Sequence, residues 1–281
     1  MSNFVITTDS TADLSDELRQ RYGIRVIPLT IVLGEESFLD GEQFTAADLY
    51  RRFREDGTLP MTSAPSVQQY LDFFSAIRAE GAEIVHLTIS AELSNSYQAS
   101  CLAAAELEGV YCVDSRMLSA GVGLLAIEGA ECRERGMGAA ETAERLRALT
   151  EKVDTSFVLD GLDYMRKGGR CSGVVAIGAN LLQLRPALML RDGKVHVYKK
   201  YRGKTEHVYH QYIEDRLSGR RVRGEHVVFI QSGEIAPELL DELEAQVREL
   251  TGAKELHRLT AGCTICAHCG PKTIGLMFFD E

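Results

Sequence analysis

The most metal-like segment of the chain places four soft ligands within seven residues, in the pattern Cys263-x-x-Cys266-x-His268-Cys269. Thiolate and imidazole groups at this spacing are typical ligands of zinc or of an iron–sulfur cluster. Zinc sites usually combine two separated ligand pairs, however, and no separate second pair lies elsewhere in the sequence. We therefore interpret these cysteines as small apolar side chains and assign no metal ligand.

Three clusters of hydroxyl-bearing residues follow predicted strands, at residues 9–11 (Asp-Ser-Thr), 62–66 (Thr-Ser-Ala-Pro-Ser) and 90–96 (Ser-Ala-Glu-Leu-Ser-Asn-Ser). In an open α/β sheet, ligands bind beyond the carboxyl ends of the strands, next to the N-termini of helices. Hydroxyl and unpaired backbone N–H groups at that place suit a carboxylate or a phosphate. Ordinary helix capping explains any one cluster equally well, so a binding site requires the clusters to converge in space.

Two basic segments are candidate docking positions for an anionic partner or a phosphate group. Residues 167–170 (Lys-Gly-Gly-Arg) end a short helical stretch, and residues 199–204 (Lys-Lys-Tyr-Arg-Gly-Lys) end a predicted hairpin strand. For any single lysine of these segments, a solvated surface position is the simpler interpretation.

Two partial matches to nucleotide-binding motifs fail on their context. The pattern G-x-G-x-x-A at 121–126 lies seven residues beyond the preceding strand, whereas the dinucleotide fingerprint follows its strand directly. We interpret its glycines as positions where a helix packs closely against a sheet. Gly-Lys-Thr at 203–205 resembles the end of a phosphate loop, but that motif requires a glycine where Tyr198 stands. A Gly-x-Ser-x-Gly elbow, which would indicate a serine hydrolase, does not occur.

The elements that must position these residues alternate between strand and helix over the first half of the chain. Strand-like runs end near Asp9, Leu33, Ile89 and Val113. Helical patterns begin near residue 15 and cover about 45–57, 66–80, 94–107, 119–135 and 139–152. This alternation implies crossover connections and a mostly parallel sheet flanked by helices. We expect an N-terminal α/β domain at residues 1–153.

The second half of the chain has a different pattern. Asp192-Gly193 separates strand-like runs at 187–190 and 194–202, which predicts a hairpin. Helical patterns at 204–217 and 238–250 are interspersed with strand-like runs at 227–231, 256–259 and 274–279. We expect residues 154–281 to form a C-terminal α+β domain, with a mostly antiparallel sheet covered by helices.

The charge balance limits the classes of partner. Among 281 residues, 31 are Lys or Arg and 41 are Asp or Glu, for a net charge of −10. Such a chain has no overall attraction to nucleic acid or anionic lipid, so we expect no nucleic-acid partner and at most transient membrane contact. The longest uncharged run, 171–184, is too short to span a bilayer. The N-terminus lacks the basic segment of an export signal, and we expect a cytoplasmic protein with reduced thiols.

Six motifs occur in order along the chain: TTDSTADL (7–14), MTSAPS (61–66), ISAELSNSYQ (89–98), Asp114-Ser115, KGGR (167–170) and H-x-G-P (268–271). Together they resemble the DegV family, the bacterial fatty-acid-binding proteins that include the FakB subunits of fatty acid kinase. The motifs span essentially the whole chain, which makes the resemblance specific.

The resemblance implies a two-domain α/β protein that buries one long-chain fatty acid between its domains, with no other cofactor. Residues matching Thr62, Ser94 and His268 would hold the fatty-acid carboxylate. A separate FakA-like kinase subunit would phosphorylate the bound fatty acid with ATP, and the acyl phosphate would enter phospholipid synthesis. Arg170 and Arg202 match family arginines linked to the encounter with that kinase. The chain would then be a carrier without catalytic residues of its own.

Two features depart from the family pattern. Asn95 stands where glycine is common, a mild change because Asn also tolerates left-handed backbone geometry. The cysteines at 263, 266 and 269 are not part of the pattern, so a sensitivity to oxidation or metal stays open. No residues of a tail channel can be identified from the sequence, and it therefore predicts no preference for acyl chain length or unsaturation.

Two other classes of function stay open at this point. One is a stand-alone kinase or hydrolase of a small anionic metabolite, against which the lack of a nucleotide-binding motif argues. The other is a metal-dependent regulator that uses the cysteine segment at 263–269.

Overall fold

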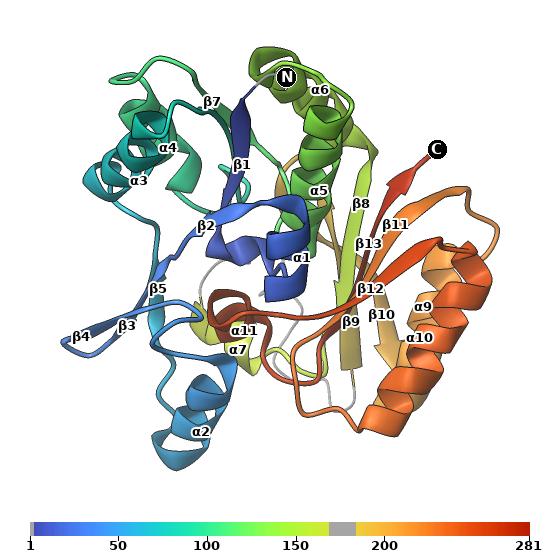
Figure 1. Cartoon of the computed structure of the whole chain (residues 1–281). Helices are drawn as coiled ribbons and strands as arrows, with labels where there is room; N and C mark the ends of the chain where they lie inside the picture. The colour runs from blue at the N-terminus through green and yellow to red at the C-terminus, as the bar shows by residue number, and fades with distance from the viewer. Residues whose placement is uncertain (1–2, 169–183) are drawn as a thin grey trace.

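The computed structural model describes residues 3–168 and 184–281, in which helices pack around three β-sheets (Figure 1). A four-stranded and a three-stranded sheet contain the strands of the first half of the chain. A six-stranded sheet contains every described strand from Val153 onward. Within these two ranges, no helix is long and apolar enough to cross a membrane.

The four-stranded sheet is parallel throughout, which confirms the prediction from the strand–helix alternation. Its order is β2 (Arg25–Ile27), β1 (Phe4–Asp9), β6 (Glu83–Thr88) and β7 (Val110–Asp114). Helices α3 (Val67–Ala79) and α4 (Ser96–Ala104) cover one face, where Tyr70 and Phe74 pack with Ile84 in a buried cluster. The carboxyl ends of the four strands therefore meet at one edge, where ligands bind in sheets of this kind.

Capping residues set where the connecting helices begin. Ser15 accepts a hydrogen bond from the N–H of Leu18 at the start of α1 (Asp16–Tyr22). Thr45 forms a reciprocal capping box with Asp48 at the start of α2 (Ala46–Asp56), as its sequence spacing predicts. A second capping box, between Ser66 and Gln69, begins α3. Each box satisfies backbone donors that a helix end leaves unpaired.

The three-stranded sheet arises where we expected one strand. The apolar run at 24–33 is divided at Pro28, so that β2 joins the parallel sheet and β3 (Thr30–Leu33) joins a separate antiparallel sheet. The order of that sheet is β4 (Glu36–Leu39), β3 and β5 (Met61–Ser63). The proline has no backbone N–H to continue the ladder, and the next N–H, of Leu29, donates to the Ser10 hydroxyl at 3.0 Å.

The six-stranded sheet confirms the prediction of a mostly antiparallel second half. Its order is β10 (Lys194–Arg202), β9 (Leu184–Arg191), β8 (Val153–Val158), β13 (Ile274–Asp280), β11 (Val222–Gln231) and β12 (Glu255–Thr260). Only the β11–β12 pair is parallel. The predicted hairpin joins β9 to β10, and Asp192 and Gly193 both have positive φ, at 52° and 76°. That geometry is the tight turn whose twist matches a hairpin.

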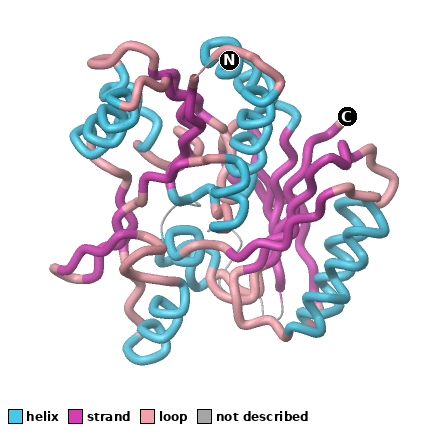
Figure 2. Tube along the Cα trace, viewed as in Figure 1, coloured by secondary structure: helices cyan, strands magenta, loops and turns pink. Residues whose placement is uncertain are grey.

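Alternating residues of this sheet bury against different helices. Val158, Phe229 and Phe278 pack with α9 (Thr205–Leu217) and α10 (Pro237–Thr251). Their neighbours Phe157 and Met277 belong to the central core around helix α5 (Ala120–Glu134). In Figure 2, the strands of this sheet have the helix pair α9 and α10 on their right and the central helices on their left. The period-2 alternation thus gives the sheet two apolar faces.

Helix α5 (Ala120–Glu134) lies between the parallel sheet and the six-stranded sheet (Figure 1), and nearly all its residues are buried. Its close approach depends on glycine. A side-chain carbon at Gly123 would lie 2.8 Å from the carbonyl oxygen of Ala12, and one at Gly129 would lie 2.9 Å from Ile6 of β1. The contact at Gly123, together with a close contact between Gly121 and the Thr155 side chain, confirms close packing as the reason for the glycine pattern at 121–126.

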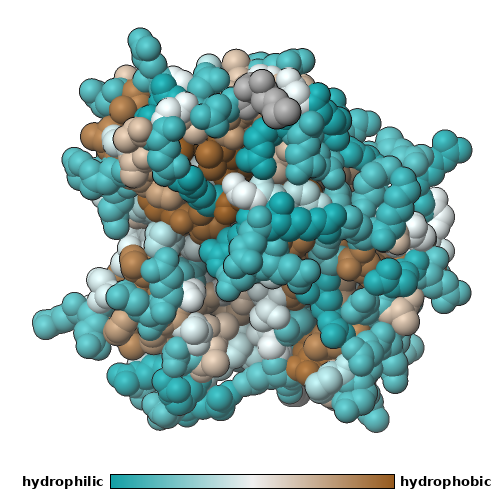
Figure 3. Space-filling model, in the orientation of Figure 1, coloured by the Kyte–Doolittle hydropathy of each residue, from teal (hydrophilic) through white to brown (hydrophobic). Residues whose placement is uncertain are grey.

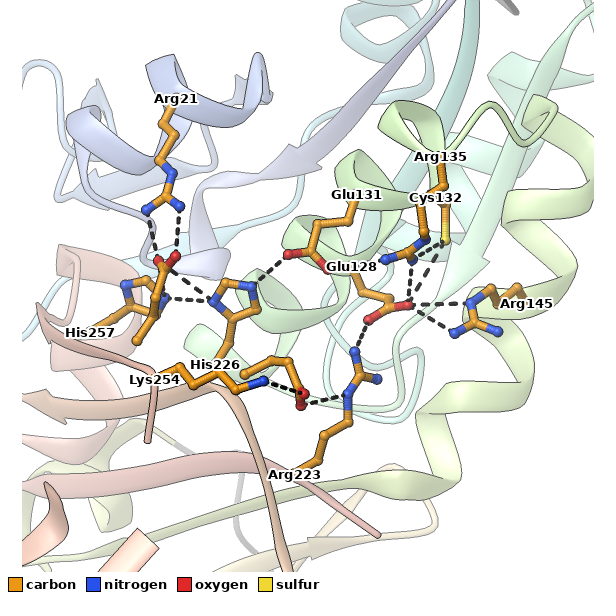
Figure 4. A network of polar contacts seen from close by, with 12 residues as sticks. Arg21, Glu128, Glu131, Cys132, Arg135, Arg145, Arg223, His226, Lys254 and His257 are labelled. Atoms are coloured by element: carbon orange, nitrogen blue, oxygen red, sulfur yellow. Dashed lines mark hydrogen bonds and ion pairs between the residues drawn. The ribbon is translucent and has the colours of Figure 1, made fainter. Parts of the chain in front are cut away.

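A buried carboxylate joins α5 to its neighbours (Figure 4). Glu128 is almost fully buried and accepts hydrogen bonds from Arg135 at 2.9 Å, from Arg145 of α6 (Ala139–Leu149) at 3.0 Å and from Arg223 of β11 at 2.7 Å. Burial alone would raise the pKa of Glu128, but the three guanidinium groups hold it below its usual value. The charge is therefore fully paired, and it ties a helix pair to the six-stranded sheet.

Two short helices, α7 (Asp163–Gly168) and α11 (Cys263–Cys269), complete the part of the chain that the structure describes. Two 3₁₀ segments, η1 (Ser10–Ala12) and η2 (Thr150–Lys152), follow β1 and α6. Most of the surface in the view of Figure 3 is hydrophilic, and apolar residues gather in a recess below the lobe that α3 and α4 form.

Candidate ligand-binding cavity

A cavity of about 540 Å³ lies where the two halves of the chain meet, a size typical of small-molecule sites. One wall comes from segments around the ends of β5, β6 and β7, at residues 62–65, 89, 91–95, 118 and 119. The opposite wall comes from the six-stranded sheet and α11, with Phe157, Val195, Ile230, Met277 and His268 among its residues. Two of the three hydroxyl clusters, at 62–66 and 90–96, therefore converge on one cavity.

Thr62 and His268 meet in the wall of this cavity. The Thr62 hydroxyl oxygen lies 3.1 Å from Nε2 of His268. Contrary to our expectation, Thr62 does not begin a helix but stands in the middle of β5, opposite Ile31 of β3. The His268 ring packs against the end of α7, since a side-chain carbon at Gly168 would lie 2.5 Å from its Nδ1. Gly168, the first glycine of the Lys-Gly-Gly-Arg motif, is thus needed for the His268 ring to fit.

Ser94 lies in the loop before α4. The helix begins at Ser96, two residues later than the start at Ser94 that we expected. Its hydroxyl lies 2.9 Å from the Ser96 hydroxyl and accepts the Ser96 N–H at 3.2 Å. Asn95 has a φ of −79°, so the asparagine adopts no left-handed conformation and replaces glycine without strain. The Ser90 hydroxyl donates to the carbonyl of Gly193 at 2.8 Å and anchors this loop to the β9–β10 hairpin.

The hydroxyl groups of the wall differ in whether their proton is already in use. Five of them donate to a protein acceptor: Ser63 to Ala64, Ser119 to Asp13, Ser232 to Gly270, Thr264 to Asp40, and Thr273 to Cys269. The Thr62 and Ser94 hydroxyls instead face groups that can either donate or accept, namely the His268 ring and the Ser96 hydroxyl. A ligand carboxylate, which only accepts, can therefore receive the protons of Thr62 and Ser94.

Large apolar side chains form much of the remaining wall. They come from both halves of the chain: Leu29, Ile89, Leu93, Leu118, Phe157, Met165, Val195, Ile230, Ile265 and Met277. Such a surface accepts a hydrocarbon chain, at about 0.8 kcal/mol for each methylene buried. The arrangement suits a molecule with one anionic end and one apolar end.

Two buried aspartates hold the wall from behind. Asp13 accepts the Ser119 hydroxyl at 2.6 Å and the Gly262 N–H at 2.8 Å. Asp40 accepts the Thr264 hydroxyl at 2.6 Å. Each aspartate thereby fixes a lining residue, Ser119 before α5 or Thr264 in α11, and Asp13 also links the N-terminal segment to the loop before α11.

The third hydroxyl cluster, at 9–11, supports the wall rather than forming it. Asp9 is fully buried and accepts the N–H of the lining residue Ile89 at 3.0 Å. Burial raises the pKa of Asp9 to about 6 and that of Asp13 to about 8, against the opposing effect of their hydrogen bonds. The nearby Asp40 adds a smaller like-charge repulsion to both. Sequence reasoning missed the roles of Asp13 and Asp40, because only the fold brings them behind the wall.

The four soft ligands at 263–269 do not converge on one point in the described structure. Cys263, Cys266 and Cys269 are buried in the central apolar core, and the Cys266 thiol donates to the carbonyl of Ala261 at 3.3 Å. Burial raises the pKa of Cys263 above its usual value. His268 instead lines the cavity. The thiols therefore behave as the apolar side chains that we favoured, in a helix that the sequence pattern did not predict.

Of the two predicted arginine positions, Arg202 lies within the described part of the chain, and it stands apart from the cavity. Arg202 is exposed at the end of β10 and is not among the described residues that line the cavity. Its neighbours Gly203 and Lys204 line a second cavity, of about 510 Å³, at the starts of α9 and α10. Arg170 lies outside the described residues.

The sequence model of the DegV family matches residues 3–281. The chain belongs to the DegV family. Among curated DegV domain-containing proteins, one from Streptomyces coelicolor is 30% identical over 97% of this chain and 96% of its own length. Another, from Clostridium perfringens, is 28% identical over the full length of both chains.

Solved structures of the DegV family have the same fold. A DegV family protein of Thermus thermophilus, whose structure is described as showing fatty acid binding, is 29% identical with a TM-score of 0.88, covering 99% of this chain and 100% of that one. A Thermotoga maritima protein, whose structure is described as revealing a fatty-acid-binding function, is 26% identical with a TM-score of 0.86 over the full length of both chains.

Proposed function

We propose that this DegV protein binds one long-chain fatty acid in the 540 Å³ cavity, between an N-terminal domain (1–153) and a C-terminal domain (154–281). The observation that carries the proposal is the combination of an apolar wall with two hydroxyls, of Thr62 and Ser94, whose partner groups can act as donors and leave the hydroxyl protons for a ligand. The fatty-acid binding described for the Thermus thermophilus and Thermotoga maritima relatives supports it.

The head group would lie at Thr62, Ser94 and His268. If His268 carries its proton on Nε2, that N–H donates to the Thr62 oxygen over 3.1 Å and leaves the Thr62 hydroxyl proton for the carboxylate. Hydroxyl donors stabilise a carboxylate without the tight ion pair that an arginine would form. The bound carboxylate would thus stay nucleophilic enough to attack a phosphoryl group.

The chain would act as a carrier that presents this carboxylate to a separate ATP-dependent kinase subunit. The acyl phosphate so formed would feed phospholipid synthesis in the cytoplasm. The exposed guanidinium of Arg202 is suited to a protein or phosphoryl encounter, because it is permanently charged and outside the cavity wall. We assign the same role to Arg170 from its motif.

Mass spectrometry of lipid extracted from the purified, natively folded protein tests the binding function. We expect about one long-chain fatty acid per chain, and a marked loss in the Thr62→Val, Ser94→Ala double variant. A protein that carries no fatty acid and takes up none from solution would contradict the proposal.

A reconstitution with ATP and a FakA-type kinase tests the carrier role. Arg202→Ala should retain the bound fatty acid and lose acyl-phosphate formation, whereas Arg191→Ala, at an exposed position on the neighbouring strand β9, should retain both. ATP turnover by the purified chain alone would instead favour the stand-alone kinase.

A further inference from the structure

We propose that His226, Glu255 and His257 bind a divalent transition-metal ion, preferentially Zn²⁺, at the edge of the six-stranded sheet. This site is separate from the cavity, and none of its three residues lines the cavity wall. In the part of the chain that the structure describes, these residues form the one group of three metal-ligating side chains whose donor atoms all lie within 4.8 Å of one another.

The register of two strands brings the three side chains together. In the parallel β11–β12 pair, His226 lies opposite Glu255, and His257 follows two residues later on β12. Residues two apart on a strand point to the same face. That face is the one toward α5 and α1, since His226 reaches Glu131 of α5 at 2.7 Å and packs edge-on against Tyr22 of α1.

The donor atoms are spaced for one small ion. Nδ1 of His226 lies 3.1 Å from Nε2 of His257, and each of these nitrogens lies 3.9 Å from Oε2 of Glu255. Ligands about 2.0–2.1 Å from a tetrahedral zinc ion are separated by roughly 3.4 Å. The triangle is therefore within about half an ångström of the required size, a distance that small side-chain rotations cover.

Glu131 orients the first ligand. It accepts a hydrogen bond from Nε2 of His226, so the Nε2 atom carries the proton and Nδ1 presents its lone pair to the triangle (Figure 4). A carboxylate on the far nitrogen of a ligating histidine is the usual outer-shell partner at zinc sites. Without an ion, the N–H of His257 fills the same space by donating to His226 over 3.1 Å.

Arg21 competes with a metal ion for the third ligand, the Glu255 carboxylate. Its guanidinium donates to both oxygens of Glu255 at 2.7 Å, from a position on α1 that is half exposed. The Glu255 side chain is itself 35% exposed, which leaves solvent access for a water as fourth ligand. Two imidazoles and one carboxylate suit Zn²⁺ rather than Mg²⁺ or Ca²⁺, which prefer oxygen ligands. A bound ion would cross-link β11 and β12 beneath α1 and α5.

The test is a Zn²⁺ titration of the full-length, chelator-treated protein in competition with a chromophoric chelator. We expect one ion per chain at this site and a rise in unfolding temperature with Zn²⁺. His257→Gln and Glu255→Gln should each weaken binding more than tenfold, and Glu131→Gln by about 10–100-fold. His196→Gln, an exposed histidine of β10, is the matched control and should leave the affinity unchanged.

Two readouts distinguish this site from the buried thiols. Co²⁺ bound here should give a tetrahedral spectrum without the charge-transfer band of a thiolate ligand. Arg21→Ala should bind Zn²⁺ several-fold more tightly, because it frees Glu255. Zn²⁺ binding that persists in folded His257→Gln and Glu255→Gln variants, or a lack of binding by the parent chain, would overturn the proposal. If those variants do not fold, an affinity of Arg21→Ala that is unchanged or weaker overturns it.

Discussion

The hydroxyl oxygen of Thr62 lies 3.1 Å from Nε2 of His268, although 206 residues separate them in the chain. Thr62 is held in the short strand β5, and His268 is held in α11 against Gly168. The two side chains therefore form one polar unit only when both halves of the chain are folded around the cavity.

A double-mutant cycle should reveal this dependence. Thr62→Val and His268→Ala should each weaken fatty-acid binding by roughly 0.5–3 kcal/mol, the range for neutral and charge-assisted hydrogen bonds. The double variant should lose less than the sum, with a coupling energy of about 0.5 kcal/mol or more. Displacement of a fluorescent fatty acid measures all four affinities. Strict additivity would show that the two residues do not act on the ligand as a unit.

Ser94→Ala should weaken fatty-acid binding by roughly 0.5–3 kcal/mol, because it removes a hydroxyl that can donate to the carboxylate while the Ser96 hydroxyl donates to it. Ser63→Ala is the matched control in the same wall. Its hydroxyl already donates to the Ala64 carbonyl, so the affinity should be unchanged. The same displacement assay compares the two, and equal effects of both variants would contradict the distinction between free and committed hydroxyls.

Gly123→Ala should lower the free energy of unfolding by about 1–3 kcal/mol, the usual cost of overpacking. Its new carbon would lie 2.8 Å from the Ala12 carbonyl oxygen and 2.9 Å from Leu14. Gly161→Ala, where no atom lies within 4 Å of such a carbon, should change the stability little. Urea unfolding followed by circular dichroism provides both values. An unchanged midpoint for Gly123→Ala would mean that α5 can move away from the N-terminal segment at little cost.

The architecture was predictable from the sequence where local signals were strong. Alternating strands and helices indicated the parallel sheet, and Asp192-Gly193 indicated the hairpin. The strand β8 and the helix α11 were not predicted, and the cysteine spacing in α11 was considered as a metal-binding pattern instead. Short elements such as β5 have little period of their own, because tertiary pairing rather than local propensity determines them.

The site was predictable only in part. Thr62, Ser94 and His268 were selected through motifs, and they line one cavity. The spacing of residues gave no means to find the apolar wall, since its side chains come from both halves of the chain. The roles of Asp13 and Asp40 were not predicted for a related reason. A buried carboxylate indicates a specific role, but burial is a property of the fold and cannot be determined from the residue type alone.

Buried Asp13 should make the stability of the protein fall as pH rises. Its pKa is raised to about 8 in the folded protein, chiefly by burial, from 3.8 for an unperturbed aspartate. Between these values the folded chain holds a proton that the unfolded chain has lost. The associated stability is fully present below pH 4 and is lost as pH rises toward 8, at about 1.4 kcal/mol per pH unit.

Asp13→Asn should remove this dependence without disrupting the geometry. The asparagine oxygen can still accept the Gly262 N–H, its amide can donate to the Ser119 hydroxyl, and Asn tolerates the φ of 50° at this position. In urea unfolding at pH 4 to 9, the free energy of unfolding of Asp13→Asn should therefore fall less steeply with pH than that of the parent chain. Between pH 4 and 8 the two slopes should differ by the contribution of one proton, about 1.4 kcal/mol per pH unit. Asp72→Asn, on the exposed surface of α3, should reproduce the parent profile. If the Asp13→Asn and parent profiles run parallel, the carboxyl of Asp13 is ionised in the folded protein, and the wall of the cavity contains a buried charge instead of a neutral acid.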